Sequence, residues 1–167
     1  MKLGNKGFSL IELIIVIAVL GIGAAIATLN FNQWVRKANI EKQAKELLTD
    51  LNDARLQSVY TKKRHSVVFQ PNSYVFKEYS SLNEDTEDGG RVITSKNVAN
   101  QMTTLSGGSL ADSIIEFDIR GFTSDWNTVR INPAYSGAAY DCIVVSNART
   151  NLGKIEKSGS SDVCNQK

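Results

Sequence analysis

One carboxylate stands alone in a long apolar segment near the N-terminus. The segment runs from Phe8 to Leu29, 22 residues, and Glu12 is its only charged residue. A membrane-spanning helix needs about 20 apolar residues, and a charge inside such a helix costs roughly 2.5–3.5 kcal/mol on insertion scales. Glu12 is therefore expected to pair with a cation or to reach the membrane surface, and it is a candidate functional residue.

Two simpler interpretations of this segment remain open. A cleaved secretory signal has a short apolar core followed by small residues, and the small residues within 21–27 resemble such a cleavage region. An ordinary anchor helix explains the length of the segment but gives no reason for Glu12. Lys2 and Lys6 precede the segment and predict a cytoplasmic N-terminus by the positive-inside rule.

A third interpretation rests on the register of glycine, aromatic residue and glutamate in Gly7-Phe8-Ser9-Leu10-Ile11-Glu12. This pattern resembles the class III signal of type IV prepilins and pseudopilins. The resemblance implies that an inner-membrane prepilin peptidase cleaves between Gly7 and Phe8 and that the new terminus, Phe8, is N-methylated. It also implies that Glu12 is the assembly glutamate, whose carboxylate pairs with the Phe8 amine of a neighbouring subunit or of its own chain.

The net charge gives no support for nucleic-acid binding. The sequence has 19 Lys and Arg and 17 Asp and Glu. Two of the basic residues, Lys2 and Lys6, lie in the expected leader, so the chain without the leader has equal numbers of both signs. Nucleic acid is therefore not an expected partner on grounds of charge.

The residues after Leu29 predict that the helix continues. Residues 30–60 contain no Pro and no Gly, so nothing in the sequence obliges the helix to end. Apolar residues recur there at spacings of three and four and form one stripe, with charged residues between them, so we predict an amphipathic helix. The stripe consists of Ile40, Ala44, Leu47, Leu51 and Ala54.

Beyond residue 61 the pattern is typical of short strands. We therefore predict an α+β fold with a leader at 1–7, a transmembrane or filament-core helix at 8–29, an amphipathic helix at 30–60 and a β-rich periplasmic head at 61–167. Alternation of apolar and polar residues within 113–119 indicates a strand with one buried face. The expected strands are 66–70, 74–79, 91–95, 113–119, 128–132, 140–146 and 153–157, and the turn 71–73 joins the first two as a hairpin.

Three head segments narrow the resemblance. Residues 115–121, 128–131 and 143–146, with Arg149 shortly after them, are similar to the GspH/FimT-like group of minor pseudopilins and minor pilins. This group often has Gly-Arg after the third segment, where the present sequence has Asn147-Ala148-Arg149.

Cys142 and Cys164 are the two cysteines of the chain. The part that follows the membrane segment is expected in an oxidising periplasm, where paired cysteines form disulfides. We therefore predict a disulfide that attaches the C-terminal tail to a strand and stabilises the head by about 3 kcal/mol in the chain-entropy model. A metal site and two unpaired buried thiols are the alternatives.

Other polar clusters have weaker signals. Carboxylates on a flexible loop are ligands that Ca²⁺ accepts, and some pseudopilins bind calcium, but the spacing of this cluster is not that of an EF-hand and a solvated loop is the simpler interpretation. The cluster is Glu84, Asp85, Glu87 and Asp88, followed by two glycines.

His65 is the single histidine and is expected in an exposed connector. No cofactor is expected, and no group of residues suggests an enzyme.

The sequence thus predicts a structural subunit, a minor pilin or pseudopilin that assembles into or primes a type IV pilus or a type II secretion pseudopilus. Its expected partners are prepilin peptidase, other pilin or pseudopilin subunits and the inner membrane, which it crosses once with the head in the periplasm. The alternative is a DNA-binding minor pilin used in DNA uptake. Arg149, Lys154 and Lys157 are the candidate phosphate contacts for that alternative.

Overall fold

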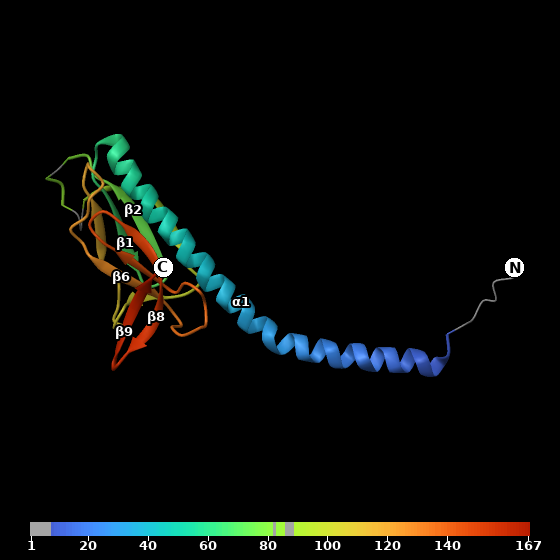
Figure 1. Cartoon of the computed structure of the whole chain (residues 1–167). Helices are drawn as coiled ribbons and strands as arrows, with labels where there is room; N and C mark the ends of the chain where they lie inside the picture. The colour runs from blue at the N-terminus through green and yellow to red at the C-terminus, as the bar shows by residue number, and fades with distance from the viewer. Residues whose placement is uncertain (1–7, 82, 86–88) are drawn as a thin grey trace, which may run out of the picture. The chain divides into compact units, whose positions relative to one another are not determined.

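The computed structural model describes residues 8–81, 83–85 and 89–167, with only the backbone described for residues 25–30. Helix α1 (Leu10–Thr61) comes first and is followed by the strands of the head (Figure 1). The strands are β1 (His65–Gln70), β2 (Ser73–Glu78), β3 (Arg91–Asn97), β4 (Met102–Thr104), β5 (Ile114–Phe117), β6 (Asn127–Ile131), β7 (Cys142–Val145), β8 (Thr150–Ser158) and β9 (Ser161–Gln166). The predicted α+β class, a long helix and a β-rich head, is confirmed.

The chain divides into two units between Arg36 and Lys37. The first unit holds the N-terminal part of α1, and the second holds the rest of the helix together with all the strands described. The backbone is helical at position 29, and the helix continues through residues 30–60, which contain no Pro and no Gly. It ends after Thr61, where Lys62 takes a left-handed conformation with φ of 57°, a common way for a helix to stop.

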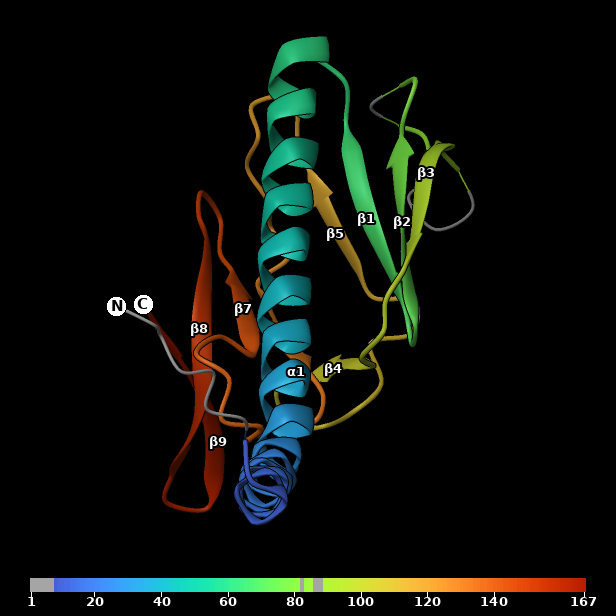
Figure 2. The same cartoon turned by 90° about the vertical axis from the view of Figure 1, so that its right-hand side faces the viewer.

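The head contains two antiparallel sheets. One has the strand order β3-β2-β1-β5, and the other has the order β4-β6-β7-β8-β9. The predicted hairpin is present as β1 and β2, whose register pairs Gln70 with Ser73. The α1 residues of this unit lie along both sheets, with β1, β2, β3 and β5 to one side and β7, β8 and β9 to the other (Figure 2).

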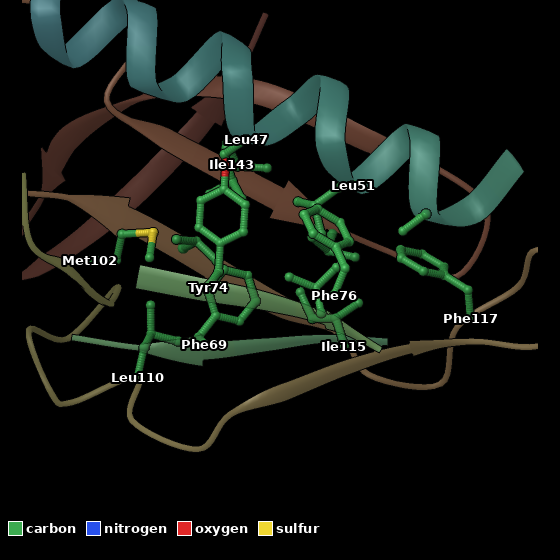
Figure 3. Packing of buried hydrophobic residues seen from close by; sticks show 14 residues of the cluster. Leu47, Leu51, Phe69, Tyr74, Phe76, Met102, Leu110, Ile115, Phe117 and Ile143 are labelled. Atoms are coloured by element: carbon green, nitrogen blue, oxygen red, sulfur yellow. The ribbon is translucent and has the colours of Figure 1, made fainter. Parts of the chain in front are cut away.

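The predicted stripe of α1 forms the helical side of the core. All five of its residues are buried. Leu47 and Leu51 point into a cluster of side chains from both sheets, where Phe69, Tyr74 and Ile115 lie opposite them (Figure 3). Removing this apolar surface from water is the main contribution to the stability of the head.

Two strands and one histidine differ from the sequence-based expectation. Strands β4 and β9 were not predicted, because β4 has only three residues and β9 is rich in polar residues. The prediction that His65 lies in an exposed connector is wrong, because His65 is the first residue of β1 and is 3% exposed. Its ring nitrogen Nδ1 lies 3.1 Å from the carbonyl oxygen of Lys63, which satisfies one of its polar atoms.

Candidate functional site

The N-terminal part of α1 has apolar side chains that nothing in the described structure covers. From Leu10 to Ile22 the large apolar residues are between 48 and 76% exposed. Such contiguous exposed apolar surface indicates a binding surface or a membrane-embedded segment rather than a free helix in water. Glu12 is the single charged residue on it.

Ser9 and Glu12 together begin α1. The carbonyl oxygen of Ser9 accepts hydrogen bonds from the backbone N–H groups of Glu12 at 3.1 Å and Leu13 at 3.2 Å, so Ser9 holds the N-cap position. A Ser at the N-cap and a Glu three residues later have the spacing of a capping box. A carboxylate in the first turn also interacts favourably with the helix dipole, which gives Glu12 a local role that sequence reasoning did not consider.

Of the two residues at the expected cleavage site, one lies within the described residues and the other outside them. Phe8 is described and exposed, whereas Gly7 and the rest of the expected leader, 1–7, lie outside the described residues. Among the described residues, no ion-pair partner is recorded for Glu12.

The structure contains the Cys142–Cys164 disulfide, with 6.2 Å between the two Cα atoms. Cys142 belongs to β7 and Cys164 to β9, and β8 lies between these strands in the sheet. Gly153 of β8 pairs with Cys142, and a Cβ atom at Gly153 would lie 2.5 Å from Sγ of Cys164. The disulfide therefore passes over β8 at a position where a side chain has no room.

The acidic loop uses one of its carboxylates to hold its own backbone. Glu84 accepts hydrogen bonds from the backbone N–H of Ser80 at 2.7 Å and of Gly90 at 2.8 Å. These bonds, first that from Gly90, hold the pKa of Glu84 below its ordinary value. Glu87 and Asp88, two of the four calcium candidates, lie outside the described residues, and no metal-binding cluster is found among the described ones, Asp85 included.

The three basic candidates for phosphate contacts are not gathered into one patch. Arg149 is exposed in the connection between β7 and β8. Lys154 and Lys157 are three residues apart on β8, so alternation directs them to opposite faces of the strand. The ammonium of Lys157 lies 5.8 Å from the ring centre of Tyr135. This geometry does not favour a nucleic-acid interface.

Sequence reasoning also missed a groove beside β6, lined by both polar and apolar residues. The groove lies next to Trp126, an aromatic residue in the connection before β6 whose side chain is 75% exposed. The residues that line the groove come from four separate segments of the chain, 104–106, 126–128, 144–146 and 160–162, so no sequence motif marks them.

Residues 2–28 match the family described as the prokaryotic N-terminal methylation motif. The match includes the predicted cleavage site, Glu12 and the first part of α1. It supports a type IV pilin-like protein, a structural class whose subunits are processed by prepilin peptidase, anchored in the membrane and assembled with other pilin subunits. No curated protein and no solved structure gives a significant match to the chain. Within the part of the chain that the structure describes, no helix combines the length and the hydropathy required to span a membrane.

Proposed function

We propose that this protein is a minor pilin or pseudopilin that assembles into, or primes, a type IV pilus or a type II secretion pseudopilus. The observation that carries the proposal is the uncovered apolar face of α1 from Leu10 to Ile22, interrupted only by Glu12. A surface of this kind needs lipid or other helices around it. The matched methylation motif covers the same residues, which supports assembly with other pilin subunits.

Before assembly, residues 8–29 anchor the chain in the inner membrane with the head in the periplasm. Lys2 and Lys6 keep the N-terminus in the cytoplasm. The disulfide between Cys142 and Cys164 supports an oxidising compartment for the head. Cleavage after Gly7 then releases the amine of Phe8, which becomes a cation beside the apolar helix.

Glu12 directs docking through charge. In a filament of packed apolar helices, its carboxylate and the Phe8 ammonium of a neighbour compensate one another, and either charge left alone is costly. The pair therefore makes docking depend on the axial position of the two helices. We propose that the head is of the GspH/FimT-like type, on the sequence resemblance of residues 115–121, 128–131 and 143–146, which lie in β5, β6 and β7 and their connections.

Variants of Glu12 in the native host test this function. Glu12→Gln keeps the capping-box pattern but removes the charge, whereas Glu12→Asp keeps the charge on a shorter side chain. Breaking a buried ion pair costs roughly 3–5 kcal/mol, a factor of several hundred or more in an equilibrium constant. We expect Glu12→Gln to be cleaved and inserted in the membrane. Its amount in sheared filaments or partner complexes should fall by at least that factor relative to wild type.

Mass spectrometry of the same samples checks that cleavage after Gly7 is unaffected. Glu12→Asp should retain more incorporation than Glu12→Gln, since the ionic partner remains. Glu12→Ala, which removes both the charge and the capping side chain, is a third variant. If Glu12→Gln enters filaments at the wild-type level while Glu12→Ala does not, the side chain acts through helix capping and the docking role of its charge is wrong. If none of the variants changes incorporation, the assignment of this protein as a filament subunit that depends on Glu12 fails.

A further inference from the structure

A groove of about 750 Å³ lies on the sheet that contains β6 and β7. Its floor includes Thr128 and Val144, which pair across these strands and are half-buried. Their neighbours Val129 and Ile143 are fully buried in the core, so the floor is the sheet face opposite the core. The walls come from the chain after β4 at Ser106 and from the start of β9. A concave site of this size accommodates a ligand of several rings.

Trp126 provides a flat apolar surface at this groove. The residue is 75% exposed, and the structure records no hydrogen bond from its indole N–H to any described residue. An exposed indole of this kind offers a large apolar face together with one polar donor. It suits a ligand ring that has an apolar face and polar edges.

The groove offers no unpaired charge to a ligand. Asp162 is the single charged residue among those that line it, and both of its carboxylate oxygens are used. Nη1 of Arg130 donates to one oxygen at 3.0 Å, and the hydroxyl of Tyr135 donates to the other. No Lys or Arg lines the groove, so a phosphate chain has no counter-ion there.

The remaining polar lining consists of hydroxyls and an amide. Within the described residues, the structure records no side-chain hydrogen bond for Asn127, Thr128, Ser160 or Ser161. Each of these groups donates and accepts, as the hydroxyls of a sugar do. At the groove, β7 is paired with β6 on one side and with β8 on the other, so it has no free edge to which a peptide could add as a strand.

We propose that this groove binds a neutral saccharide, with one sugar ring stacked on Trp126 and its hydroxyls bonded by Asn127, Thr128 and Ser161. A sugar ring combines a face of C–H groups with edges of hydroxyls, which matches the aromatic platform and the neutral hydroxyl lining. The activity goes beyond assembly, because it gives the head a means of attaching to a glycan surface.

The test uses the two tryptophans of the chain. With excitation selective for tryptophan, Trp126 is the only emitter in Trp34→Phe and Trp34 the only one in Trp126→Phe; Trp34 is also exposed, at 67%. The full-length protein is kept in a detergent without a sugar headgroup, which avoids competition. The probes are hexasaccharides of α-linked glucose, β-linked glucose, mannose and N-acetylglucosamine. We expect at least one to shift Trp126 emission to the blue and to protect it from acrylamide, with no change for Trp34.

Calorimetry with the responding hexasaccharide then measures affinity. Trp126→Ala should weaken binding at least tenfold, and Thr128→Val should weaken it several-fold, while the matched variant Trp34→Ala binds as wild type. Equal unfolding midpoints of these proteins show that the fold is retained. The proposal is overturned if no hexasaccharide at millimolar concentration changes Trp126 emission, or if Trp34→Ala loses binding equally. It is also overturned if Trp126→Ala is depleted from filaments without any sugar effect, because the groove is then a contact between subunits.

Discussion

At the scale of single residues, Asp50 shows how a charge is accommodated on the buried side of α1. The residue is 9% exposed, although it is one of the charged residues that lie between the apolar residues of the stripe in sequence. The Tyr74 hydroxyl donates to it at 2.6 Å and the Lys96 ammonium at 2.7 Å. Burial, and then the hydrogen bond to Asp50, raise the pKa of Tyr74. The three side chains join α1, β2 and β3.

Tyr74→Phe removes one of these bonds without changing the shape of the core. A hydrogen bond to a charged group contributes about 1.5–3 kcal/mol, so we expect the free energy of unfolding to fall by about that amount. Urea unfolding of the full-length chain in detergent measures the change. Tyr60→Phe is the matched control, because Tyr60 is 87% exposed and should leave stability unchanged. A loss below about 0.5 kcal/mol for Tyr74→Phe would show that Lys96 alone satisfies Asp50.

At the scale of elements, polar side chains of α1 hold the loops of the head. Gln43 donates to the carbonyl oxygen of Asn100 at 2.7 Å and accepts from its backbone N–H at 2.9 Å. Arg55 donates to the carbonyl oxygens of Gly121 at 2.9 Å and Asn147 at 3.2 Å, and burial lowers its pKa. These contacts fix the connections after β3, β5 and β7 to the helix, in addition to the apolar packing.

The disulfide acts on the same scale, since it joins two strands that are not neighbours. Cys142 and Cys164 are 22 residues apart in sequence. Closing a loop of that size stabilises by about 3 kcal/mol in the chain-entropy model. The bond also holds β9, which pairs with β8 at the edge of its sheet as far as the structure is described.

Reduction of the disulfide should therefore lower stability by about 3 kcal/mol. Urea unfolding of the full-length protein with and without reductant measures the difference. The double variant Cys142→Ala/Cys164→Ala is the control, because reductant has nothing to break in it. Non-reducing peptide mapping of protein from the native host should recover the two cysteines as one linked peptide. Free thiols at both positions in that material contradict the prediction.

At the scale of the whole molecule, several carboxylates have lowered pKa values in the folded state, so the stability of the fold depends on pH. Hydrogen bonds from the backbone of Gly90 and Ser80 lower the pKa of Glu84, and a hydrogen bond from Lys63 is the largest cause of the lowered pKa of Glu78. A carboxylate of this kind stabilises the fold above its unfolded pKa, and the effect is lost as pH falls through its folded pKa. Burial raises the pKa of Asp141, so its contribution has the opposite sign and is lost as pH rises through its folded pKa.

Glu84→Gln tests this dependence, because an amide has one accepting oxygen for the two N–H groups that Glu84 binds. We expect its thermal midpoint to lie below that of wild type near neutral pH. The difference should shrink as pH falls below the ordinary Glu value of 4.5, since the wild-type carboxylate is then progressively protonated. Glu46→Gln, at an exposed position, is the control and should follow wild type throughout. A difference that stays constant down to the acid limit would show that the charge of Glu84 is not what stabilises the loop.

The sequence by itself determined the features that depend on local order. The spacing of Gly7, Phe8 and Glu12 indicated the N-terminal motif, which the family match covers. The three- and four-residue recurrence from Ile40 to Ala54 predicted the buried face of α1, because helical geometry alone decides which side chains share a face. The two cysteines of a chain expected in an oxidising compartment predicted the disulfide.

Only the tertiary structure decided which residues are buried and which distant segments cover them. His65 and Asp50 are polar, yet both are buried. Asp50 accepts its hydrogen bonds from Tyr74 and Lys96, which are far from it in sequence, whereas the ring of His65 contacts the nearby carbonyl oxygen of Lys63. Strand β9 has little apolar alternation of its own; pairing with β8 and the disulfide hold it in the sheet. The groove beside Trp126 exists because four chain segments meet there. Contacts between residues far apart in sequence leave no periodic trace along the chain, so only the folded structure reveals them.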